Sequence, residues 1–198
     1  MKRAVRAKAE EIAARARERL LGRATGAAAA PAAPAEGPAF RSGIPWMKER
    51  RAGALVIICS SSRFLSQTAE FLSKGLHMPA YDLVAIPGGI QWLALPDLLP
   101  KHNTVARWMT KYLIRRHRLA RVVCVAHEGC GAYEDESVIG ALAHLATGKS
   151  TSEHQIQQLL KVGRELTEMF QVSVELYYAS VADDAIVFRK VEEPPKPT

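Results

Sequence analysis

Three side chains that suit a divalent metal ion stand at the ends of two apolar stretches. Residues 55–58 lead into Cys59, and residues 121–126 lead into His127, which Cys130 follows three positions later. Two thiolates and one imidazole are a donor set that zinc accepts, and three protein ligands leave a fourth position open for water. Zinc lowers the pKa of a bound water toward about 7, which supplies a nucleophile at neutral pH.

Both apolar stretches predict strands that are buried on two faces. Each is a short run rich in β-branched residues and bounded by turn residues, as in the parallel sheets of α/β proteins. The loops that leave the carboxyl ends of such strands form the crevice where α/β proteins usually bind ligands. If the two strands are neighbours, Cys59, His127 and Cys130 meet at that edge.

The remaining pattern predicts an α/β fold. We expect a four-stranded, mostly parallel sheet flanked by helices, a short fifth C-terminal strand, and an N-terminal helix and linker outside the core. Strands are predicted at 54–59, 81–86, 121–126, 172–181 and 185–191, the last after a turn at Asp183 and Asp184. Helices are predicted at 3–21, from 64 to near Gly75, around 105–113, and at 136–147 and 156–170.

The predicted helix around 105–113 carries apolar and basic side chains on opposite sides. We interpret the basic side as a solvated surface, with anion binding as the less favoured alternative. The apolar side consists of Val105, Trp108, Met109, Tyr112 and Leu113, and the basic side of Arg107, Lys111, Arg115 and Arg118.

Positive charge is concentrated at the N-terminus. Residues 1–51 hold 12 Lys and Arg against 5 Asp and Glu, whereas residues 52–198 hold 15 of each. We predict a basic N-terminal helix with an Ala- and Pro-rich, partly disordered linker over 1–43, a zinc domain over 44–193 and a frayed tail over 194–198. The basic arm is either a solvated helix or a weak site for an anionic partner.

The composition excludes several classes of protein. Hydrophobic residues at 48% and charged residues at 24% fit a soluble globular protein, and no apolar run approaches the roughly 18 residues of a membrane span. The N-terminus lacks the apolar segment of a secretory signal. Three Cys without a disulfide-like spacing favour a reducing, cytoplasmic setting. The sequence contains no redox Cys-x-x-Cys and no glycine-rich nucleotide loop.

The two strand ends together resemble the β-class carbonic anhydrases. That family pairs Cys-x-Asp-x-Arg after its first strand with His-x-x-Cys-Gly after its third, and this chain has Cys59-Ser-Ser-Ser-Arg63 and His127-Glu-Gly-Cys130-Gly. The resemblance covers roughly residues 46–190. It implies that Cys59, His127 and Cys130 bind Zn²⁺, that Gly88, Gly89 and Gly131 shape the substrate pocket, and that the chain forms a homodimer or higher homo-oligomer.

The resemblance implies reversible hydration of carbon dioxide to bicarbonate by a zinc-bound hydroxide, but the chain departs from the family at one position. Ser61 stands where the family has Asp, while Arg63 is kept. A serine hydroxyl carries no charge, so it cannot pair with Arg63 or act as a carboxylate ligand. The turn Pro87-Gly88-Gly89-Ile90 also replaces an Asn-Ala-Gly type turn, which changes the expected pocket.

Two alternatives to carbonic anhydrase activity stay open. One is a hydrolase of a linear carbon dioxide analogue of the carbonyl sulfide type. The other is a catalytically impaired zinc-binding module that works through its basic N-terminal arm. Taken singly, Cys59, His127 or Cys130 would more often be a buried thiol or a hydrogen-bonded histidine. Their joint position favours the zinc triad, whereas Cys124 is expected in the core.

Overall fold

A computed structural model describes residues 40–44, 51–134 and 150–193. The chain divides into two compact units, Met1–Trp46 and Met47–Thr198. Of the first unit, the structure describes residues 40–44, which are exposed. The predicted helices at 3–21 and 136–147, most of the linker and the tail lie outside the described residues. No helix in the described part of the chain is long and apolar enough to cross a membrane.

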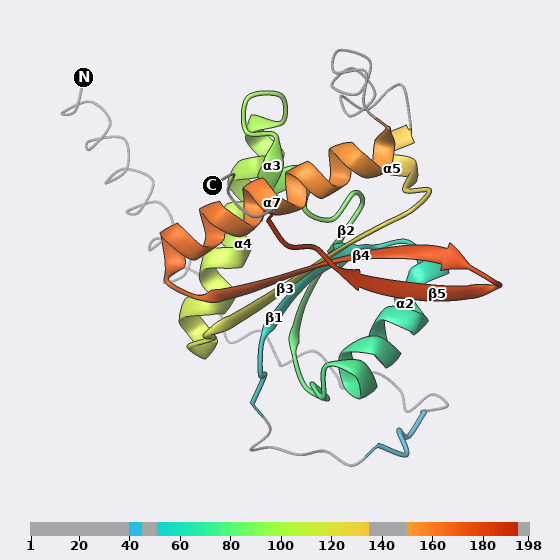
Figure 1. The fold of residues 1–198 in the computed structure, drawn as a ribbon. Coiled ribbons are helices and arrows are strands. Elements are labelled where there is room, and N and C mark those ends of the chain that lie inside the picture. Colours follow the sequence, from blue (N-terminus) through green and yellow to red (C-terminus); the bar gives the residue numbers. More distant parts are fainter. Residues whose placement is uncertain (1–39, 45–50, 135–149, 194–198) are drawn as a thin grey trace, which may run out of the picture. The chain divides into compact units, whose positions relative to one another are not determined.

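The second unit is built on a five-stranded sheet (Figure 1). Four strands are parallel and the last is antiparallel, which confirms the predicted sheet. The β4–β5 connection is the predicted two-residue turn, with φ of 49° at Asp183 and 60° at Asp184. In sheet order, the strands are β2 (Asp82–Ile86), β1 (Leu55–Cys59), β3 (Arg121–His127), β4 (Ser173–Ala182) and β5 (Ala185–Lys190).

Helices cover both faces of this sheet (Figure 1). One face packs against α3 (Gln91–Ala94), α4 (Pro100–His117) and α7 (Thr151–Phe170). The other packs against α2 (Ser62–Glu70) and its π-helical extension η1 (Phe71–Gly75). The remaining short helix is α5 (Gly131–Glu134). Alternate residues of each strand therefore enter different cores, because side chains along a strand point to opposite faces.

The two central strands bring the chemistry-bearing loops together. β1 and β3 are parallel neighbours, with Leu55 opposite Val122 and Ile58 opposite Val125. Apart from the half-buried Arg121 and Cys59 at their ends, all residues of the two strands are buried. Parallel neighbours end at the same edge of a sheet, so Cys59 and His127 emerge on one side of the molecule.

The helix α4 packs on the sheet through a face that overlaps the predicted one only at Met109 and Leu113, which are half-buried against the core. Its Asn103 amide donates hydrogen bonds to the carbonyl oxygens of Trp92 and Leu93, at 2.9 and 3.0 Å. These bonds fix the rotation of α4 and turn small and medium side chains toward the core. The buried face consists of Asn103, Ala106, Thr110 and Ile114, whereas Val105, Trp108 and Tyr112 of the predicted apolar face are exposed.

Candidate metal centre

The structure brings two sulfur atoms and one imidazole into a single cluster. The Sγ atoms of Cys59 and Cys130 lie 3.7 Å apart, and with a ring nitrogen of His127 the candidate ligand atoms all fall within 4.8 Å of one another. In a tetrahedral zinc site with Zn–S bonds of about 2.3 Å, two sulfur ligands stand about 3.8 Å apart. The spacing of the two thiols therefore fits one shared zinc ion.

The hydrogen bond that His127 makes leaves its Nε2 as the nitrogen available to a metal ion. Its Nδ1 lies 2.8 Å from the backbone oxygen of Glu128, a contact in which only the ring N–H can donate. The proton therefore belongs on Nδ1, which leaves a lone pair on Nε2. Nε2 is buried and has no hydrogen-bond partner, in a side chain that is only 3% exposed. A metal ion would supply the missing partner of this nitrogen.

The imidazole is also fixed in orientation by its neighbour. Phe64, near the start of α2, stacks on the His127 ring with centroids 4.2 Å apart and an angle of 28° between the planes. Phe64 is itself buried. The segment from the end of β1 to the start of α2 thus supplies both a candidate ligand, Cys59, and the aromatic ring that restrains the histidine.

The thiols of Cys59 and Cys130 are joined by a hydrogen bond, and a bound cation would take the place of its proton. The hydrogen bond from the Cys130 thiol, helped by the backbone N–H groups of Gly88 and Ser61, lowers the pKa of Cys59 to about 4 against the effect of burial. The same hydrogen bond, together with burial, raises the pKa of Cys130 above its usual range. One thiolate therefore forms at neutral pH, and a divalent cation favours the second.

The loop after β2 lies directly against the candidate ligand Cys59 at the end of β1. Gly89 has φ of +54°, and a Cβ on it would stand 3.0 Å from the Cys59 nitrogen and 3.0 Å from the Ile58 carbonyl carbon. Gly88 has φ of +75° and faces Gln91 and Ala132. Gly89 therefore allows the backbone of this loop to pack closely on the end of β1. Gly131, the exposed first residue of α5, has open space around its Cβ position.

We expect Gly89→Ala to destabilise the protein by about 1–3 kcal/mol, because the left-handed backbone is strained for alanine and its Cβ presses on the backbone of β1. Zinc affinity should fall as well, since Cys59 is displaced. Urea unfolding and zinc titration measure the two effects. Gly131→Ala is the matched control, and equal losses in both variants would contradict the assignment of close packing to Gly89.

Ser61 and Arg63 lie close to the candidate ligands, Ser61 through its backbone N–H at Cys59 and Arg63 through Gly129, but no hydrogen bond joins their side chains. Ser61 is the half-buried N-cap of α2, and its side chain makes no capping bond. The exposed guanidinium of Arg63 donates instead to the backbone oxygen of Gly129, between His127 and Cys130. Arg63 therefore fastens the β1 loop to the β3 loop, in place of the arginine–carboxylate pair that an Asp at position 61 would permit.

A buried polar network behind the site was not predicted. The Tyr133 hydroxyl donates to Gln158 Oε1 at 2.5 Å, and Gln158 Nε2 lies 2.8 Å from His154 Nε2. Gln91, 1% exposed, donates to the backbone oxygen of Ala132 at 3.3 Å. These contacts anchor the turn that carries Cys130 to α7 and α3. Their partners are 25 and 41 residues apart, and no local pattern in the sequence signals them.

Two further groups near the site in sequence point elsewhere. Glu128 is exposed, and its Oε2 accepts a hydrogen bond from the Val181 backbone N–H at 3.0 Å. Cys124 is fully buried in the core, as expected, and burial raises its thiol pKa to about 12. Within the described part of the chain, Cys59, His127 and Cys130 form the group that can hold a metal ion.

Comparisons with known proteins find similarity in structure alone. No protein-family model matches the sequence, and no curated protein matches it. Among solved structures, a β-carbonic anhydrase of Aspergillus fumigatus is 18% identical, with 73% of this chain and 78% of that chain covered and a TM-score of 0.45. A β-carbonic anhydrase of Trichomonas vaginalis is 11% identical, with 73% of this chain and 86% of that chain covered and a TM-score of 0.44.

A third solved structure is one of two tetrameric β-carbonic anhydrases of Sordaria macrospora. It is 14% identical, with 70% of this chain and 81% of that chain covered and a TM-score of 0.44. At these identities the similarity concerns the fold alone, and the chemistry rests on the chain's own residues. All three of these solved structures are β-carbonic anhydrases, at low identity to this chain.

Proposed function

We propose that this chain is a zinc-dependent, carbonic anhydrase-like protein that hydrates carbon dioxide to bicarbonate. The observation that carries the proposal is the buried, unpartnered Nε2 of His127 beside two thiols whose sulfur atoms are 3.7 Å apart. This donor set suits zinc and leaves a coordination position open. Zinc, when bound, supplies the Lewis acidity that lowers the pKa of a coordinated water.

The chain's own residues prepare the site for that ion. The Glu128 backbone oxygen keeps the His127 proton on Nδ1, and Phe64 restrains the ring. Two thiolates donate more negative charge than imidazoles would, which opposes ionisation of a bound water. The N–H groups of Ser61 and Gly88, directed at Cys59, withdraw part of that charge.

Arg63 is the group we assign to the anionic product. Its guanidinium is exposed and tied to the Gly129 backbone oxygen, so a positive charge stands beside the loop that joins His127 to Cys130. A cation at the mouth favours bicarbonate over neutral carbon dioxide. The Ser61 hydroxyl can donate or accept a hydrogen bond there, but it cannot neutralise Arg63.

The test is stopped-flow hydration of carbon dioxide by zinc-loaded protein. We expect the protein to raise the rate above that of buffer, and Cys130→Ser to abolish the increase. A wild-type rate equal to buffer, in protein that contains one zinc per chain, would contradict the proposal. Sulfide release from carbonyl sulfide by the same sample would then favour the hydrolase alternative, and the absence of both activities would favour the impaired zinc module.

The resemblance also leads us to propose that the chain self-associates. The two Sordaria macrospora enzymes are tetrameric, which is a property of those proteins. Sedimentation of the full chain measures the number of copies here.

A further inference from the structure

The exposed side of α4 carries an unusual combination of side chains. Trp108 is 63% exposed and Tyr112 is 51% exposed. Their rings stack on each other with centroids 5.6 Å apart and planes 18° apart. They line a hollow of about 500 Å³ together with three basic residues, and we call this set the aromatic–basic surface: Trp108, Lys111, Tyr112, Arg115 and Arg116.

The basic character extends beyond this hollow. A second hollow of about 430 Å³ shares Arg116 and adds Arg51, His117 and Arg118, with Asp82 as its one acidic residue. Asp82 is already paired with His117, at 2.5 Å. The two hollows share Arg116, and we call their basic side chains together the cationic track.

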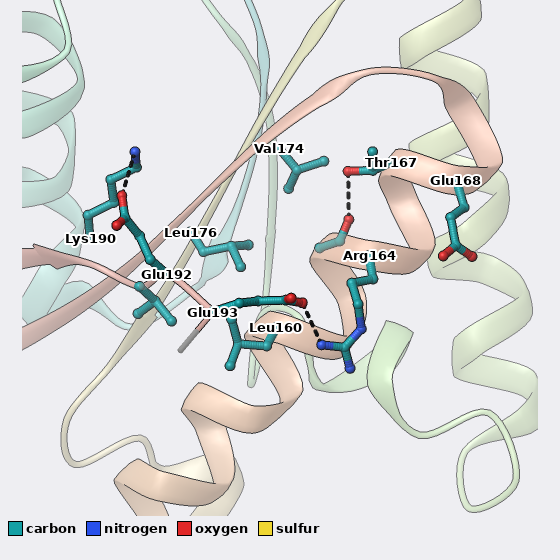
Figure 2. A pocket seen from close by; sticks show the side chains of 11 residues that line it. Leu160, Arg164, Thr167, Glu168, Val174, Leu176, Lys190, Glu192 and Glu193 are labelled. Carbon is teal, nitrogen blue, oxygen red and sulfur yellow. Dashed lines mark hydrogen bonds and ion pairs between the residues drawn. The ribbon is translucent and has the colours of Figure 1, made fainter. Parts of the chain in front are cut away.

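The charge on this track is not neutralised within the described part of the chain. The segment Pro100–His117 contains five Lys and Arg and no Asp or Glu. Arg107 pairs with Glu165 at 3.6 Å, but Lys111, Arg115 and Arg116 form no ion pair with any described residue. By contrast, in the hollow between α7, β4 and β5 (Figure 2), Arg164 pairs with Glu193 and Lys190 with Glu192, at 2.7 and 3.0 Å.

Helix stability explains only part of this arrangement. Basic residues in the last turn of a helix, here Arg115, Arg116 and His117, interact favourably with its negative end. That effect does not account for Lys111, which lies a turn earlier, or for two large aromatic rings left in solvent. A pair of stacked, exposed rings beside unpaired cations is instead the arrangement that binds bases and phosphates together.

We propose that the aromatic–basic surface binds single-stranded nucleic acid. Phosphates would contact Lys111, Arg115 and Arg116, and unpaired bases would stack on Trp108 and Tyr112. A second copy of this chain is a poorer occupant, because pairing two α4 faces brings like charges together with no carboxylate on either helix. Duplex is also poorer, since its bases are already stacked on one another. The proposal is independent of the metal centre.

Fluorescence anisotropy tests the proposal with full-length protein and a labelled strand of about 20 thymidines, which exceeds a site of about 4–16 nucleotides. We expect Trp108→Ala to weaken binding about fivefold or more, the loss of one stacked base. Lys111→Gln and Arg115→Gln should each make the negative slope of log affinity against log salt concentration smaller in magnitude by about 0.7. Lys74→Gln, which removes the same charge from η1, and Leu65→Ala, which removes an exposed apolar side chain from α2, are the matched controls and should bind as wild type does.

Four outcomes would overturn the proposal. In the first, the strand does not bind. In the second, the α4 variants bind as tightly as the Lys74→Gln control, which would assign binding to the basic N-terminal arm. In the third, a duplex of equal length binds more tightly than the single strand. In the fourth, Trp108→Ala dissociates an oligomer without changing strand affinity, which would make the surface a contact between copies.

Discussion

Replacing Cys130 by serine is expected to lower zinc affinity on the order of 100- to 1,000-fold. Structural zinc sites with four ligands bind with about 10–16 kcal/mol, so one ligand contributes about 2.5–4 kcal/mol. Serine preserves the size of the side chain but removes the thiolate. The Sγ of Cys59 then loses the second sulfur, 3.7 Å away in the wild type, with which it would bind the zinc ion. Competition with a chromogenic chelator measures the change, and His127→Ala should show a loss of similar size.

The control for this prediction is the third cysteine. Cys124 is buried in the core on the α7 side of the sheet, outside the metal cluster, and Cys124→Ala should leave zinc affinity within about twofold of wild type. Wild-type affinity in Cys130→Ser, or an equal loss in Cys124→Ala, would contradict the ligand assignment.

Ser61→Asp is expected to raise the rate of carbon dioxide hydration about 100-fold, the lower end of what a positioned acid–base group contributes. Ser61 follows Cys59 by two residues, is the N-cap of α2, and directs its backbone N–H at Cys59, so a carboxylate there would stand close to the candidate metal ligands. It would accept a proton from the attacking water and pair with the guanidinium. The N-cap position also favours Asp, so the substitution does not weaken the helix.

Ser61→Asn separates charge from size in this experiment. Asparagine matches aspartate in volume and caps helices equally well, but it carries no charge, so it should stay at the wild-type rate. A gain of the same size in Ser61→Asn would show that charge is not the cause. An unchanged rate in zinc-loaded Ser61→Asp would show that the missing carboxylate does not limit this site.

The sheet could be predicted from the sequence because its signals are local. Residues 55–58 and 121–126 are apolar runs with polar ends. Strands that are apolar on both faces belong in the interior of a parallel sheet, where helices cover both sides. The convergence of Cys59 and His127 follows from that adjacency. Strand ends differed from the prediction by about one residue, as at β4, whereas α7 begins at Thr151, five residues before the predicted start.

Local sequence patterns could not predict the orientation of α4 or the buried polar network that anchors the Cys130 turn. The apolar spacing of Val105, Trp108 and Tyr112 fits a helical face, but so does the series Ala106, Thr110 and Ile114. The choice between the two faces is made by tertiary contacts such as those of Asn103 with the carbonyls of α3. The α3 helix, four residues long, is too short to show any period.

X-ray absorption spectroscopy of protein purified without added zinc tests the central claim most directly. The claim is that Cys59, His127 and Cys130 hold one zinc ion in a tetrahedral site with a position left open. We predict one zinc per chain, with two sulfur neighbours at about 2.3 Å and lighter nitrogen or oxygen neighbours at about 2.0–2.1 Å. A zinc shell without sulfur, a shell of four sulfurs, or protein that binds no zinc would contradict it.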